Sequence, residues 1–129
     1  MNHVSLAEYS WPVVVETNRL LCLPKQAVHG PTSDGYVSAR DLWESSILTP
    51  MTLADAVELC RRCHQLAPFC NFNGNTFVAI IRRVIGSHNS PPTQAAVLRS
   101  LAGHIVAGTA SPEERTEFTK ILTQSGVDS

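Results

Sequence analysis

The longest regular pattern of hydrophobic and polar positions in this chain runs from Asn75 to Gly86. Large apolar side chains recur there with the spacing of one helical face. They are Phe77, Ile80, Ile81, Val84 and Ile85. Asn75 can cap the start of the segment, and Gly86 can end it. The pattern predicts a central apolar helix, residues 75–86, covered by other elements on several sides.

Two helices are predicted before the central one. Ser38 with Asp41, and Thr52 with Asp55, have the spacing of capping boxes at helix starts. A proline follows each segment and ends it, because proline cannot continue a helix.

Two further helices are predicted after the central one. Ser90 can cap the first of these helices, and Pro91 suits its first position. Gly108 can end that helix. Ser111 with Glu114 forms another capping box, which begins the last helix.

Residues 1–37 have a different pattern. Pro12 to Glu16 and Arg19 to Leu23 are short runs of branched aliphatic side chains, with Thr17-Asn18 between them as a turn. These runs predict a β-hairpin or an extended arm lying against the helices. We therefore expect a single, mainly α domain over residues 1–129. Four to five short helices form a core over 38–125, and the arm occupies 1–37.

Composition narrows the classes that this chain can belong to. A hydrophobic fraction of 43% and a charged fraction of 16% over 129 residues suit a globular domain with its own core. No apolar run approaches the roughly 20 residues that span a bilayer. The first residues contain no basic stretch followed by an apolar block. We therefore expect a soluble, cytoplasmic protein without a membrane partner.

Acidic and basic residues are unevenly distributed along the chain. No acidic residue lies between Glu58 and Glu113, whereas five arginines do. They are Arg61, Arg62, Arg82, Arg83 and Arg99. Arginine favours planar, multidentate contacts with carboxylate or phosphate groups. If consecutive helices pack antiparallel, these arginines form one basic patch that contacts a partner.

Cys60-Arg-Arg-Cys63-His64 matches C-x-x-C-H and resembles a c-type haem attachment site. Cys60, Cys63 and Cys70, with His64 or Cys22 as the fourth ligand, also offer a tetrahedral zinc site. However, no methionine follows as an axial haem ligand, and no second ligand pair completes a zinc signature. Because both cysteines continue the apolar stripe of a regular helix, the preferred interpretation is reduced thiols in the core. No cofactor is predicted.

The sequence offers little for catalysis. No G-x-S-x-G elbow and no phosphate-binding glycine loop appears. Asp55 and Glu58 are the only carboxylates near the core helices, and both fall on a predicted solvated face. The chain is therefore predicted to be non-enzymatic.

Phe69 and Phe72 flank a loop beside the predicted arginine patch. Arginine with an aromatic side chain is typical of the centre of a protein interface. We expect a binding module for a protein partner, such as a small accessory, inhibitor, adaptor or assembly protein. Nucleic-acid binding through the same arginines is the first alternative, although a pI near 6.5 argues against it. A metal or haem site is the second alternative, and self-association stays open.

Overall fold

The computed structural model describes residues 3–88 and 90–125, which form six α-helices and one pair of short strands. In chain order, the elements are β1 (His3–Val4), α1 (Trp11–Cys22), the 3-10 turn η1 (Leu23–Lys25), α2 (Tyr36–Ser46), β2 (Met51–Thr52), α3 (Leu53–Leu66), α4 (Asn73–Ser87), α5 (Pro92–Ala107) and α6 (Pro112–Ser125). The predicted mainly α, single-domain fold is confirmed.

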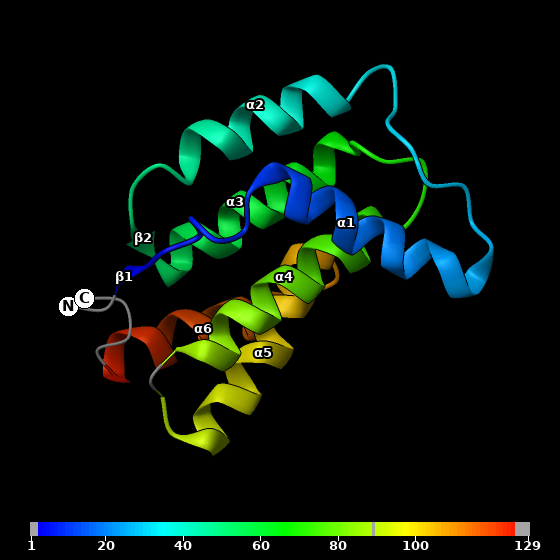
Figure 1. Cartoon of the computed structure of the whole chain (residues 1–129). Coiled ribbons are helices and arrows are strands. Elements are labelled where there is room, and N and C mark those ends of the chain that lie inside the picture. The colour runs from blue at the N-terminus through cyan, green and yellow to red at the C-terminus, as the bar shows by residue number, and fades with distance from the viewer. Residues whose placement is uncertain (1–2, 89, 126–129) are drawn as a thin grey trace.

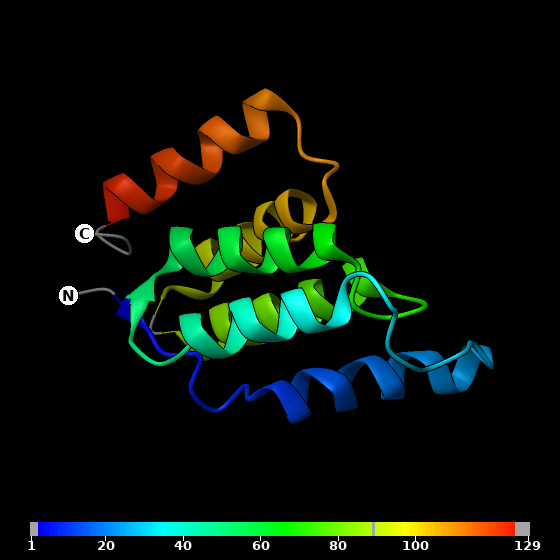
Figure 2. The same cartoon turned by 90° about the horizontal axis from the view of Figure 1, so that it is seen from above.

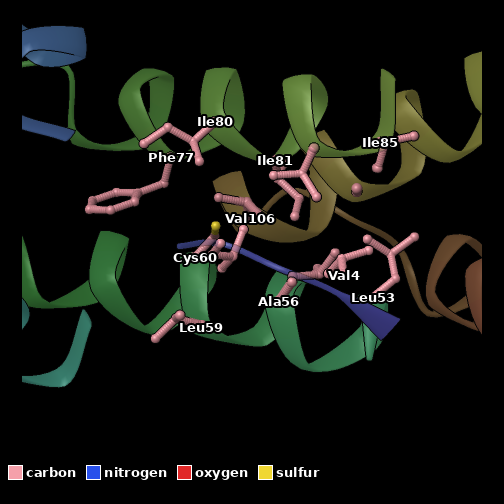
Figure 3. Packing of buried hydrophobic residues seen from close by; sticks show 14 of the residues in the cluster. Val4, Leu53, Ala56, Leu59, Cys60, Phe77, Ile80, Ile81, Ile85 and Val106 are labelled. Carbon is pink, nitrogen blue, oxygen red and sulfur yellow. The ribbon is translucent and has the colours of Figure 1, made fainter. Parts of the chain in front are cut away.

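Helix α4 is the central element, as predicted. It contacts α1, α3 and α5, and all five apolar residues of its predicted stripe are buried. In Figure 3, Phe77 and Ile81 point from α4 toward α3. Burying each such side chain contributes about 1.5–3 kcal/mol before the conformational entropy is subtracted.

The ends of α4 differ from the prediction. The helix begins at Asn73 rather than Asn75, because the Asn73 side chain bonds both the N–H and the C=O of Phe69 at 2.8 Å. Phe72 precedes the helix in the left-handed region, with a φ of 59°. Gly86 does not end the helix, which continues through Ser87.

The predicted hairpin over residues 12–23 is wrong, because this segment forms α1. Its buried side chains recur at helical spacing: Trp11, Val14, Asn18 and Cys22. Pro12 is compatible with the helix since the first turn needs no N–H from it. The run of valines that suggested a strand therefore lies along a helix.

Residues before α1 are part of the core rather than an arm. His3 pairs with Thr52 and Val4 with Met51 in an antiparallel strand pair that joins β1 to β2 (Figure 1). Leu6 is fully buried, and the carbonyl of Tyr9 accepts a hydrogen bond of 2.7 Å from the Trp43 indole.

Two of the predicted helix starts are confirmed by their hydrogen bonds. The Thr52 hydroxyl accepts from the N–H of Asp55 at 3.1 Å. Ser111 and Glu114 exchange both bonds of a capping box, at 3.0 and 3.1 Å. Gly108 ends α5 with a φ of 82°, also as predicted.

The other two predicted starts are wrong. Helix α2 begins at Tyr36 without a cap from Ser38. It follows Gly35, where a Cβ would lie only 1.7 Å from the Leu66 carbonyl oxygen, so the backbones approach too closely for any side chain. Helix α5 begins at Pro92, preceded by Pro91 rather than capped by Ser90.

The helices are stacked with α1 and α6 on opposite outer sides (Figure 2). Helices α3 and α4 lie between them, and α5 packs against α3, α4 and α6. Helices α3, α4 and α5, which contact one another, form the walls of the candidate site.

Candidate functional site

The predicted arginines do not share one set of neighbours. Arg61 is tied within α3 to Glu58, with Nε 2.9 Å from Oε1 and Nη2 against Oε2. This pair raises the pKa of Arg61 and lowers that of Glu58. Arg62 instead lines a hollow beside Ser46 and Met51.

The second arginine pair is also divided. The guanidinium of Arg83 lies over the Tyr9 ring, 5.9 Å from its centre. Arg82 points to a different surface, where it lies against Gly103 of α5. Arg99 is half-buried on α5, one turn before Gly103. The structure therefore places Arg82 against α5, the helix that carries Arg99, whereas Arg61, Arg62 and Arg83 have other neighbours.

Arg82 lines an open groove of about 600 Å³ between α3, α4 and α5, which we call the α4 groove. Its lining contains basic, amide and apolar side chains but no carboxylate. The residues are His64, Phe72, Asn73, Gly74, Asn75, Val78, Arg82, Gly103, His104 and Ala107. This is the size of a typical ligand or side-chain pocket.

Gly103 makes room for Arg82. A Cβ at this position would lie 3.0 Å from Nη2 and 3.2 Å from Nε of the guanidinium. Within the described residues, Arg82 has no carboxylate partner. A glycine inside a helix costs about 1 kcal/mol relative to alanine. The close approach of the guanidinium explains why glycine suits this position.

Gly74 has the same relation to His64. A Cβ at Gly74 would lie 3.2 Å from both Cε1 and Nε2 of the imidazole. The opposite ring nitrogen, Nδ1, is 2.7 Å from the carbonyl oxygen of Val106, to which it donates. This bond holds the His64 ring with its Nε2 edge toward the first turn of α4.

His104, at the far side of the groove, is already paired. Its Nδ1 lies 2.6 Å from Oε2 of Glu114, the same carboxylate that caps α6. The N–H of Ser111 and then His104 lower the pKa of Glu114. Glu114 therefore pairs with His104, whereas Arg82 has no carboxylate partner among the residues that the structure describes.

The two loop phenylalanines have different environments. Phe69 is 2% exposed and stacks on Trp11, with ring centres 5.7 Å apart. It also meets Tyr36 edge-on at 6.1 Å. Phe72 lines the α4 groove. Of the predicted aromatic pair, only Phe72 faces a surface where a partner can bind.

The C-x-x-C-H residues are built into the fold. Cys60 and Cys63 are fully buried in the core, as preferred from the sequence. Burial raises the pKa of Cys60 well above 9.0 and that of Cys63 to about 12. His64 is turned toward Val106, and Cys70 is exposed near Pro31. Among residues 3–88 and 90–125, no group of three His, Cys, Asp or Glu side chains is arranged to hold a metal ion.

One polar cluster was not predicted from the sequence. Asn18 is fully buried in α1, and its amide donates to the Asn71 carbonyl at 2.7 Å and to the Thr76 hydroxyl at 3.0 Å. Its Oδ1 lies 3.0 Å from Nδ1 of His29 and 3.7 Å from the Cys22 sulfur. Burial raises the pKa of Cys22, which disfavours a reactive thiolate. The cluster therefore fastens α1 to the start of α4 rather than forming a nucleophilic centre.

Comparison of the chain with protein-family models, curated proteins and solved structures finds no match in any of the three. Within the described part of the chain, each helix is too short or too polar to cross a bilayer.

Proposed function

We propose that this chain is a non-enzymatic binding module, and that a segment of a protein partner binds in the α4 groove. The observation that carries the proposal is the pair of glycines in the groove walls. Gly74 and Gly103 lie where a Cβ would press on His64 and Arg82. Both basic side chains thereby line an open groove rather than being covered by their neighbours.

The chemistry of the lining favours a partner with an acidic side chain. Arg82 has no carboxylate partner in the described residues. Its guanidinium can donate two parallel hydrogen bonds to a carboxylate of the protein partner. Val78, one turn before Arg82 on α4, supplies apolar surface in the groove, and Phe72 lines the same groove at the start of the helix. Arginine and aromatic side chains are among the residues that often dominate the free energy of a protein interface.

Site-specific photocrosslinking tests this proposal. A photoreactive amino acid replaces Asn75, which is exposed in the groove, and another replaces Leu48, which is 79% exposed and outside the groove. Incubation with an extract of the native host should give a protein adduct at the first position and not at the second. Adding Arg82→Gln should reduce that adduct about tenfold, since a charge-assisted hydrogen bond contributes roughly 1.5–3 kcal/mol.

Arg62→Gln is the matched control, because Arg62 lies in a different hollow. It should leave the adduct unchanged. Equal capture by the Arg82 and Arg62 variants would contradict the proposal, as would an adduct that forms only at the Leu48 position.

A further inference from the structure

Helix α3 has an exposed face that lies between α2 and α6 on the side toward the viewer in Figure 2. Asp55, Glu58 and Arg62 are exposed on it, and together with Leu59 they line an open hollow of about 340 Å³. This hollow shares no lining residue with the α4 groove. An interaction on this face is therefore independent of the proposed function.

The residues of this face have the spacing of a seam between two helices. Four of them are separated by four, three and four positions, which keeps them on one side of a helix. They are Asp55, Leu59, Arg62 and Leu66. Leu59 is 5% exposed, whereas Leu66 is 36% exposed. The seam therefore alternates charged and apolar side chains along α3.

The two charged residues of the seam have no ion-pair partner. Among the residues that the structure describes, neither Asp55 nor Arg62 forms an ion pair. Glu58, which lies between them, is already bound by Arg61, with Nε 2.9 Å from Oε1. Arg61 lowers the pKa of Glu58 most, and Arg62 contributes least. The face therefore offers one carboxylate and one guanidinium, seven residues or about 10 Å apart along the helix.

The opposite signs of these two charges narrow the kinds of partner. An anionic surface such as a phosphate backbone is repelled by Asp55, and a cationic surface is repelled by Arg62. A second copy of the same chain carries both charges, and a two-fold axis presents them in the reverse order. Each Asp55 then lies opposite the Arg62 of the other copy, so both contacts are attractive.

We propose that two copies of this chain associate through α3, with the two helices antiparallel about a two-fold axis that passes between Glu58 and Leu59. This point is midway between Asp55 and Arg62. The same symmetry brings Leu66 of one copy toward the start of α3 in the other, where Met51 lines the hollow. Because exposed ion pairs are weak and screened by salt, the dimer dissociates on dilution and at high ionic strength.

Sedimentation velocity over a series of protein concentrations tests this proposal with two charge reversals. Arg62→Glu places two acidic side chains opposite each other at both contacts, and Asp55→Lys does the same with two basic side chains. Each variant alone should dimerise about a hundredfold more weakly than wild type. An equimolar mixture of the two should restore the dimer, because both contacts then join opposite charges again.

Lys25→Glu is the matched control, since it changes the net charge by as much as Arg62→Glu does and lies in η1 rather than on α3. It should dimerise like wild type. Circular dichroism verifies the helical content of each variant. The Thr52 cap of α3 accepts from the backbone N–H of Asp55, which Asp55→Lys keeps.

A wild-type chain that stays monomeric up to about 1 mM would overturn the proposal. So would an equimolar mixture of the two reversed variants that stays monomeric where wild type dimerises, or an equal loss of dimer in Lys25→Glu protein. Capture of a partner at position 75 is a separate measurement, because Asn75 lines the α4 groove and not this hollow. Failure of the dimer therefore leaves the proposed function standing, and the reverse also holds.

Discussion

Cys60 and Cys63 differ from metal-binding or haem-binding cysteines in their surroundings. Both are fully buried. Figure 3 shows Cys60 among the apolar side chains of the core. Removing a thiolate from water is unfavourable, so desolvation raises the pKa of Cys63 from 9.0 to about 12. The neutral thiols therefore act as small apolar side chains, and this state depends on the folded structure.

We predict that the free energy of unfolding decreases between pH 9 and pH 12 with a steeper slope in wild type than in Cys63→Ala. In this range the unfolded chain ionises its thiols, whereas folded Cys63 stays protonated until about pH 12. The unfolded state then binds fewer protons, so the stabilisation is fully present below pH 9 and is lost as the pH rises. Urea unfolding at a series of pH values measures both slopes. Identical slopes would show that Cys63 is not desolvated.

The type of a residue does not indicate which distant residues it contacts in the fold. Asn18 has the type of a turn residue, and Thr17-Asn18 was predicted to form a turn. Its buried amide instead bonds groups 53 and 58 positions away, Asn71 and Thr76. Nothing in the local sequence indicates these partners, because the bonds form only once α1 packs on α4. The helical spacing of Trp11, Val14 and Cys22 was the available signal for α1.

At the scale of elements, a capping pattern predicts a helix start only where the backbone can use it. Thr52 and Ser111 cap their helices as the sequence indicates. Ser38 has the same kind of pattern, yet α2 has already begun at Tyr36. The close contact of Gly35 with the backbone at Leu66 sets that start, and a contact between distant segments is not encoded in a four-residue pattern.

Thr52→Ala and Ser38→Ala provide a matched test of this distinction. Thr52→Ala should lower the free energy of unfolding by about 1 kcal/mol, because it removes the acceptor of the Asp55 N–H. Ser38→Ala should change it by less than about 0.5 kcal/mol, since Ser38 is exposed inside α2. Chemical denaturation of the two variants gives both values. An equal loss in both would contradict the observed start of α2.

At the scale of the whole molecule, the sequence pattern predicted that α4 is central. It did not predict which faces of the helices contact one another. A stripe of five large apolar side chains required contacts on several sides, and α1, α3 and α5 provide them. The arginine pairs had been expected on one surface. Adjacent residues in a helix point about 100° apart, so Arg82 faces the groove while Arg83 faces Tyr9.

The groove itself depends on three helices that are separated along the chain. Its signal in the sequence was weak: Gly103 lies inside a helix, where glycine costs about 1 kcal/mol relative to alanine. The structure shows that the group in contact with Gly103 is the Arg82 guanidinium. Gly86, by contrast, has open space at its Cβ position, so it provides a control for the intrinsic effect of glycine in a helix.

Whether the α4 groove is the binding site is tested most directly by comparing two variants, Gly103→Ala and Gly86→Ala. Each carries the photocrosslinker at position 75, and the amount of partner that it captures is measured. Both substitutions should maintain or raise the free energy of unfolding, by up to about 1 kcal/mol, because alanine favours the helix and the Arg82 side chain can swing outward. Gly103→Ala should nevertheless reduce the adduct about tenfold, since the displaced guanidinium loses its charge-assisted contact, whereas Gly86→Ala should leave it unchanged. Undiminished capture by a stable Gly103→Ala protein would contradict the groove as the binding site.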